Sequence, residues 1–100
     1  VEPYVFSPDN DGMDDYANIR YQFNEPGNVA SVIIFDAKGR IVTELANNIS
    51  LSTSGTFVWE GLHSDNRIAP AGTYLIWFKV FNIDGTVNIY KETVVLAKRI

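Results

Sequence analysis

Cysteine is missing from this chain of 100 residues, and histidine occurs once, as His63. The absence of cysteine excludes disulfide frameworks, thiolate zinc sites and cysteine nucleophiles. A lone histidine with no second histidine or cysteine nearby is usually a solvated side chain. No serine is marked as its partner in a Ser-His-Asp arrangement either. The composition therefore predicts a binding, structural or addressing module and not an enzyme.

Basic residues and long apolar runs are also scarce. Lys and Arg total 8 against 12 for Asp and Glu, which gives a net charge of −4. Binding to a nucleic-acid backbone needs clustered basic residues, so we expect no nucleic-acid partner. No run of 18 apolar residues occurs, so we expect no membrane-spanning segment. The chain has no signal peptide and no starting methionine, which we interpret as the mark of a cut inside a longer polypeptide.

The residues that are abundant favour strands. Val, Ile and Thr total 26, against 12 for Ala and Leu together, and β-branched side chains fit a pleated surface. Turn signals recur between short apolar segments, while no segment has helical periodicity over three turns. We therefore predict an all-β fold, an antiparallel immunoglobulin-like β-sandwich of about seven strands in one domain, residues 1–100. The expected strands are residues 4–6, 16–23, 29–35, 40–45, 56–60, 73–83 and 86–97, with irregular loops at 46–54 and 61–71.

Alternation along these strands predicts the core. Side chains of successive residues point to opposite faces of a sheet, so one apolar set from each strand is expected between the layers. The expected core residues are Ile19, Tyr21, Phe23, Val32, Ile34, Phe57, Trp59, Tyr74, Ile76 and Phe78.

The opposite face of the longest strand is apolar as well. Leu75, Trp77 and Phe81 point away from the core, and Ile33 and Phe35 do so on a strand expected to share the sheet. A contiguous apolar patch of several hundred Å² usually marks a contact, so these five residues predict an interface with Trp77 as its anchor. The alternative is that scattered surface apolar residues are normal and that the loop 46–54 covers some of them.

A cluster of acidic residues lies near the beginning of the chain. Four of the 12 acidic residues fall within residues 9–15, at a spacing that resembles a calcium loop with its turn at Gly12. The alternative is an Asx-rich turn that needs no metal. The expected calcium ligands are Ser7, Asp9, Asp11, the carbonyl group of Met13, and Asp15.

Several segments, in order, resemble known secreted domains. The strand–turn–strand SVIIFDAKGRIV (31–42), followed by FVWEG (57–61) and APAGTY (69–74), resembles the Ig-like domain of flagellar hook-capping proteins. The opening FSPDNDGMDD (6–15) resembles the start of gliding-motility-associated C-terminal domains. The ending VVLAKRI (94–100) is similar to the tails of sorting domains read by type IX secretion.

The resemblance implies a β-sandwich at the end of a larger secreted or bacterial cell-surface protein. It implies no enzymatic activity for the domain itself, and it implies the upstream domains of the same chain and the secretion machinery as partners. Two functions stay open. The first is a C-terminal module for export, sorting and surface attachment. The second is a structural or adhesive Ig-like spacer that binds a neighbouring domain, another protein or a glycan.

Overall fold

Strands account for all the regular secondary structure in the described part of the protein. The computed structural model describes residues 5–6, 16–82 and 84–97, and these residues contain no helix. This confirms the all-β fold class. The strands are β1 (Val5–Phe6), β2 (Ala17–Gln22), β3 (Asn28–Asp36), β4 (Ile41–Ser50), β5 (Ser54–Trp59), β6 (Gly72–Asn82) and β7 (Val87–Leu96).

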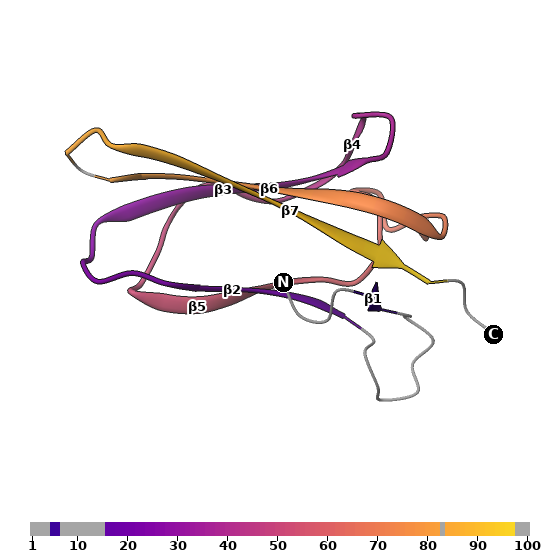
Figure 1. The fold of residues 1–100 in the computed structure, drawn as a ribbon, viewed down its shortest axis with the longest axis horizontal. Helices are drawn as coiled ribbons and strands as arrows, with labels where there is room; N and C mark the ends of the chain where they lie inside the picture. Colours follow the sequence, from indigo (N-terminus) through magenta and orange to yellow (C-terminus); the bar gives the residue numbers. More distant parts are fainter. Residues whose placement is uncertain (1–4, 7–15, 83, 98–100) are drawn as a thin grey trace.

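The strands form two sheets that face one another as the layers of a sandwich (Figure 1). One sheet has five strands in the order β1-β7-β6-β3-β4, and the other pairs β2 with β5. Neighbouring strands are antiparallel, except that β1 lies parallel to β7. The sandwich predicted from the sequence is therefore confirmed, with a small sheet of two strands facing a larger one.

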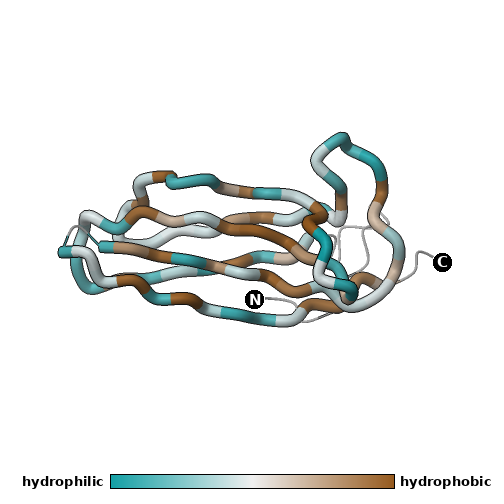
Figure 2. The backbone as a smooth tube through the Cα atoms, turned by 90° about the horizontal axis from the view of Figure 1, so that it is seen from above, coloured by the Kyte–Doolittle hydropathy of each residue, from teal (hydrophilic) through white to brown (hydrophobic). Residues whose placement is uncertain are grey.

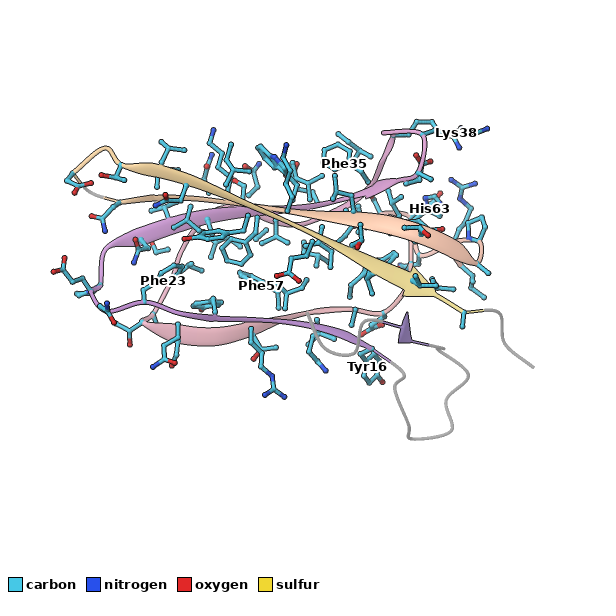
Figure 3. All side chains as sticks on the ribbon, in the orientation of Figure 1. Tyr16, Phe23, Phe35, Lys38, Phe57 and His63 are labelled. Carbon is cyan, nitrogen blue, oxygen red and sulfur yellow. The ribbon has the colours of Figure 1, made fainter. Side chains whose placement is uncertain are left out.

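The core lies between the two layers, where the alternation of the strands places it. Of the ten expected core residues, seven are buried, and Tyr21, Phe23 and Phe57 are half-buried and packed against them. Figure 3 shows Phe23 and Phe57 between the layers. Hydrophobic and hydrophilic residues are interleaved along the strands (Figure 2), as expected when each strand has one buried face.

Strand β4 is longer than the sequence indicated. The prediction ended this strand at residue 45 and made 46–54 an irregular loop, whereas β4 continues to Ser50 and pairs with β3 along its length. Its register shifts at several points, and Asn48 adopts a left-handed φ of 52°, which asparagine tolerates better than most residues. The Asn48 N–H donates to the Ser31 hydroxyl at 3.0 Å. Residues 46–50 are therefore an edge strand and do not form a covering loop.

Two hairpins share one turn geometry. The Asp36 N–H donates to the Arg40 carbonyl and the Asn82 N–H donates to the Thr86 carbonyl, each at 2.9 Å. Gly39 and Gly85 have φ values of 82° and 88°, as a three-residue loop with a left-handed last residue requires. The predicted strands 73–83 and 86–97 left two residues between them, whereas β6 ends at Asn82 and the connection is longer.

Candidate docking face

The outer face of the five-stranded sheet collects the five residues predicted as an interface. Strands β3 and β6 pair so that Ile33 lies opposite Trp77 and Phe35 lies opposite Leu75. Residues directly opposite one another on paired strands share a face, and Phe81 lies further along that face of β6. All five side chains are half-buried. Each is more exposed than the buried neighbours that alternate with it, which are Val32, Ile34, Ile76, Phe78 and Val80.

The two faces of this sheet differ in what covers them. In Figure 3, Phe35 lies on the side of the sheet that faces away from the second layer, whereas Phe57 lies between the layers. Trp77 is half-buried within the described residues, so part of it is accessible to a partner. The assignment of these residues to an interface stays a prediction.

Strands β4 and β7 enlarge the apolar surface beyond the predicted residues. Ile41 lies opposite Phe35, Val87 lies opposite Phe81, and Ile89 lies opposite Lys79; all three apolar side chains are exposed. Sequence reasoning missed them because it followed only β3 and β6. The apolar residues at 87 and 89, two positions apart, were the available signal. We name the following set the outer apolar face: Ile33, Phe35, Ile41, Leu75, Trp77, Phe81, Val87 and Ile89.

Charged residues lie within and beside the outer apolar face, and Lys79 separates Trp77 from Phe81 along β6. Lys91 lies opposite Trp77 on β7, and Lys79 follows Trp77 by two residues on β6. Glu44 lies opposite Ile33 on the edge strand β4. A shallow hollow of about 570 Å³ over this surface is lined in part by Phe35, Trp77 and Lys91. Trp77 therefore has two lysines as neighbours on this face, in a protein whose net charge is −4.

The predicted calcium ligands lie outside the described residues. These are Ser7, Asp9, Asp11, Met13 and Asp15. Within residues 5–6, 16–82 and 84–97, no group of three or more His, Cys, Asp or Glu side chains could hold a metal ion. The calcium loop and the Asx-rich turn therefore both stay open as predictions.

His63 lies in a loop that is closed by backbone hydrogen bonds. Its N–H donates to the Arg67 carbonyl at 2.8 Å and its carbonyl accepts the Asn66 N–H at 2.9 Å. The Asp65 carboxylate accepts the backbone N–H of Arg67, which holds the pKa of that carboxyl below its ordinary value, and an ion pair of 2.6 Å joins the carboxylate to the Arg67 side chain. These contacts stabilise a turn that contains the half-buried histidine.

Tyr74 anchors the beginning of β6. Its hydroxyl donates to the Pro70 carbonyl at 2.5 Å, and its ring meets Trp59 edge-on with the centroids 5.0 Å apart. Burial, and then the negative charge of Asp36, raise the pKa of the phenol. A tyrosine bonded to the backbone a few residues upstream is typical of the corner of Ig-like sandwiches, so we assign Tyr74 a structural part.

The comparison that decides the family covers almost the whole chain. The family model of the CHU_C type IX secretion signal domain matches residues 2–96. The chain belongs to this family. A type IX secretion signal domain marks a secreted or cell-surface protein, and such domains are in general non-catalytic. In the described part of this secretion signal domain, no helix has the length and apolar character needed to cross a membrane.

Two solved structures resemble the secretion signal domain in fold. FlgD from P. aeruginosa matches with a TM-score of 0.61 and 23% identity, over 81% of this chain and 62% of the FlgD chain. CopC from Methylosinus trichosporium OB3b matches with a TM-score of 0.55 and 18% identity, over 83% of this chain and 78% of the CopC chain. No curated protein matches the sequence. At these identities the two structures show the sandwich fold alone.

Proposed function

We propose that residues 1–100 form the single, non-catalytic C-terminal domain of a larger protein, and that the secretion machinery reads it through the outer apolar face during export and surface attachment. The family establishes the export and sorting module. The observation that carries the rest of the proposal is the register that places Trp77 and Leu75 beside Ile33 and Phe35 on the outer side of the sheet.

The composition of this face supports docking to a protein. Sheets can pack face to face through interdigitating apolar side chains, and tryptophan is among the residues that dominate binding energy at interfaces. Binding to an anionic membrane usually needs four to eight clustered basic residues, whereas among the described residues the register of β6 and β7 puts Lys79 and Lys91 next to Trp77. These two lysines favour a partner with acidic side chains around an apolar centre.

The alternative is a structural spacer in which the same face packs against a preceding domain of the parent protein. Both functions bury the outer apolar face, so the face alone does not distinguish them. The two functions have different consequences for the parent protein. A sorting surface controls where the parent protein is found, while a packing surface controls how stably its domains hold together.

The test compares two substitutions in the full parent protein. Trp77→Ser removes the centre of the outer apolar face. Val58→Ser is the matched control, because Val58 is exposed on β5 in the other sheet, opposite Asn18. We expect the parent protein with Trp77→Ser to remain folded but to accumulate inside the cell envelope, and the parent with Val58→Ser to be exported normally.

Two different results would contradict the proposal. Normal export with Trp77→Ser would contradict recognition through this face. If the same variant also lowered the melting temperature of the parent protein but not that of the isolated chain, the spacer function would replace the proposal. Unfolding of the isolated Trp77→Ser chain would be detected by circular dichroism, and Leu75→Ser would then be used in its place.

A further inference from the structure

The inner face of strand β7 is only partly covered by the second layer. Val94 and Leu96 point into the core and are buried. Tyr90 and Glu92 belong to the same alternating series, so they point to the same side of the sheet, but both are exposed. The neighbouring strand β6 is buried at every inner-facing position between residues 74 and 80. In the described part of the molecule, the sheet of β2 and β5 therefore covers β6 and leaves this stretch of β7 accessible.

A groove lies where β7 extends past the second layer, between β2 and β7. It has a volume of about 270 Å³, and its apolar lining consists of Ile19, Tyr21, Phe23, Ile76, Phe78 and Tyr90. The ring centroids of Tyr21 and Phe78 are 6.1 Å apart, and those of Phe78 and Tyr90 are 6.3 Å apart. Aromatic rings therefore form a wall from β2 to β7. Drug-sized ligands usually occupy pockets of about 300–1,000 Å³, so this groove has room for about one ring with its substituents.

Three polar side chains complete the lining of the groove, and they are Arg20, Gln22 and Glu92. All three are exposed. A guanidinium only donates hydrogen bonds, a carboxylate only accepts them, and an amide does both. Arg20 and Glu92 already have partners within the protein. A guanidinium has about five donor positions and a carboxylate has about four acceptor positions, so each can take a further partner. One positive and one negative charge in the same groove favour a ligand that is itself neutral.

These groups together match the chemistry of a sugar ring. One face of a pyranose consists of C–H groups and packs on aromatic rings, while its hydroxyl groups each donate and accept hydrogen bonds. Tyr90 is 51% exposed and lies two residues before Glu92 on the same face of β7, so a ring that packs on Tyr90 has the carboxylate at its edge. A purely apolar ligand would instead remove water from Arg20 and Glu92 without replacing their hydrogen bonds, which is unfavourable.

We propose that the groove between β2 and β7 binds one neutral hexose unit of a polysaccharide. The ring of the sugar packs on Tyr90, and its hydroxyl groups accept hydrogen bonds from Arg20 and donate them to Glu92. The groove opens on the inner side of the five-stranded sheet, whereas the outer apolar face lies on the other side. The site is therefore separate from the outer apolar face and does not depend on the proposed function.

Nuclear magnetic resonance titration of the 100-residue chain tests the proposal. The probes are the methyl glycosides of glucose, galactose and mannose, in which the methyl group stands for the rest of the polysaccharide. We expect at least one of them to shift the amide signals of residues 20–22 and 90–92, with a Kd of about 1 mM, as is ordinary for a ligand of this size. The absence of shifts with all three at about 50 mM, far above that Kd, would overturn the proposal. Cyclohexanol, a ring of similar size with a single hydroxyl group, is the control for apolar binding. Equal shifts with cyclohexanol at the same concentration would also overturn the proposal.

Substitutions at exposed positions identify the groups that bind the sugar. Tyr90→Ala removes the ring on which the sugar packs, and we expect it to raise the Kd about tenfold or more. Tyr16→Ala is the matched control, because Tyr16 is 46% exposed but does not line the groove, and it should leave the Kd unchanged. Glu92→Ala should weaken binding of the methyl glycoside to a similar degree without weakening binding of cyclohexanol, because only the sugar uses the carboxylate as an acceptor. An unchanged Kd with Glu92→Ala would overturn the proposal even if Tyr90→Ala did not fold.

Discussion

At the scale of single residues, Trp59 connects the two layers of the sandwich. Its side chain is 1% exposed, its ring meets Tyr74, and its Nε1–H donates to the Leu62 carbonyl at 3.0 Å. Trp59→Ala should lower the free energy of unfolding by about 3–5 kcal/mol, as truncation of large buried aromatic residues does. Urea denaturation measures this loss. Val58→Ala, at the exposed neighbour, should change it by less than about 0.5 kcal/mol. Equal effects of the two substitutions would contradict the assigned core.

Gly55 is the residue over which Tyr21 packs. The two lie opposite one another on β5 and β2, and a Cβ atom at position 55 would overlap the tyrosine ring. That ring is held by Phe23 and Phe57, with centroids 5.6 and 5.7 Å away, so it cannot simply move aside. Gly55→Ala should destabilise the protein by about 1–3 kcal/mol, as overpacking does. In a double-mutant cycle, Tyr21→Val should remove most of that penalty, and strictly additive effects would show that no clash exists.

Three aspartates in the turns make the free energy of unfolding depend on pH. The Asp84 carboxylate accepts the Thr86 N–H, which holds its pKa below 3.8, and a backbone N–H does the same at Asp36 and Asp65. A lowered pKa in the folded state stabilises the protein above 3.8, and this contribution is lost as the pH falls through the folded value. The urea concentration at the midpoint of unfolding should therefore decrease as the pH is lowered below 3.8. Asp84→Asn, whose amide oxygen still accepts the bond, should show a weaker fall, and an identical pH profile would contradict this cause.

At the scale of the strands, the alternation of apolar and polar residues predicted the core correctly, whereas local composition misplaced the end of a strand. The period of two placed Ile34, Ile76 and Phe78 in the core, because each strand has one face between the layers. Composition misplaced the end of β4, since Asn47, Asn48 and Ser50 are typical of loops. This segment is strand because the preceding strand β3 pairs with it at Ala46, Ile49 and Ser50. Such pairing depends on tertiary context and not on local preference.

The hairpin between β3 and β4 depends on one glycine. Gly39 has a φ of 82° and no atom lies within 4 Å of where its Cβ would be, so a side chain there meets conformational strain but no clash. Gly39→Ala should cost about 1–2 kcal/mol of unfolding free energy, the usual penalty for this conformation. Gly39→Asn should cost less, because asparagine tolerates left-handed backbone. Thermal denaturation of the two variants checks this order, and equal stability of Gly39→Ala and the unchanged protein would refute it.

At the scale of the whole molecule, the sequence predicted the sandwich, and its order of motifs indicated the type IX family that matches residues 2–96. It could not predict the parallel pairing of β1, because two residues carry no periodic signal. Nor could it predict how far the outer apolar face extends, since Ile41, Val87 and Ile89 join that face only through the pairing of β4 with β3 and of β7 with β6. The predicted calcium ligands lie outside the described residues and remain untested.

The measurement that tests the central claim most directly is the export of a reporter enzyme fused in front of residues 1–100, in a bacterium that has type IX secretion. If the chain is a sorting module read through its outer apolar face, the reporter should appear outside the cells with the unchanged chain and with Val58→Ser. With Trp77→Ser it should be retained, while the domain remains folded. Retention of the reporter with the unchanged, folded chain would contradict the account.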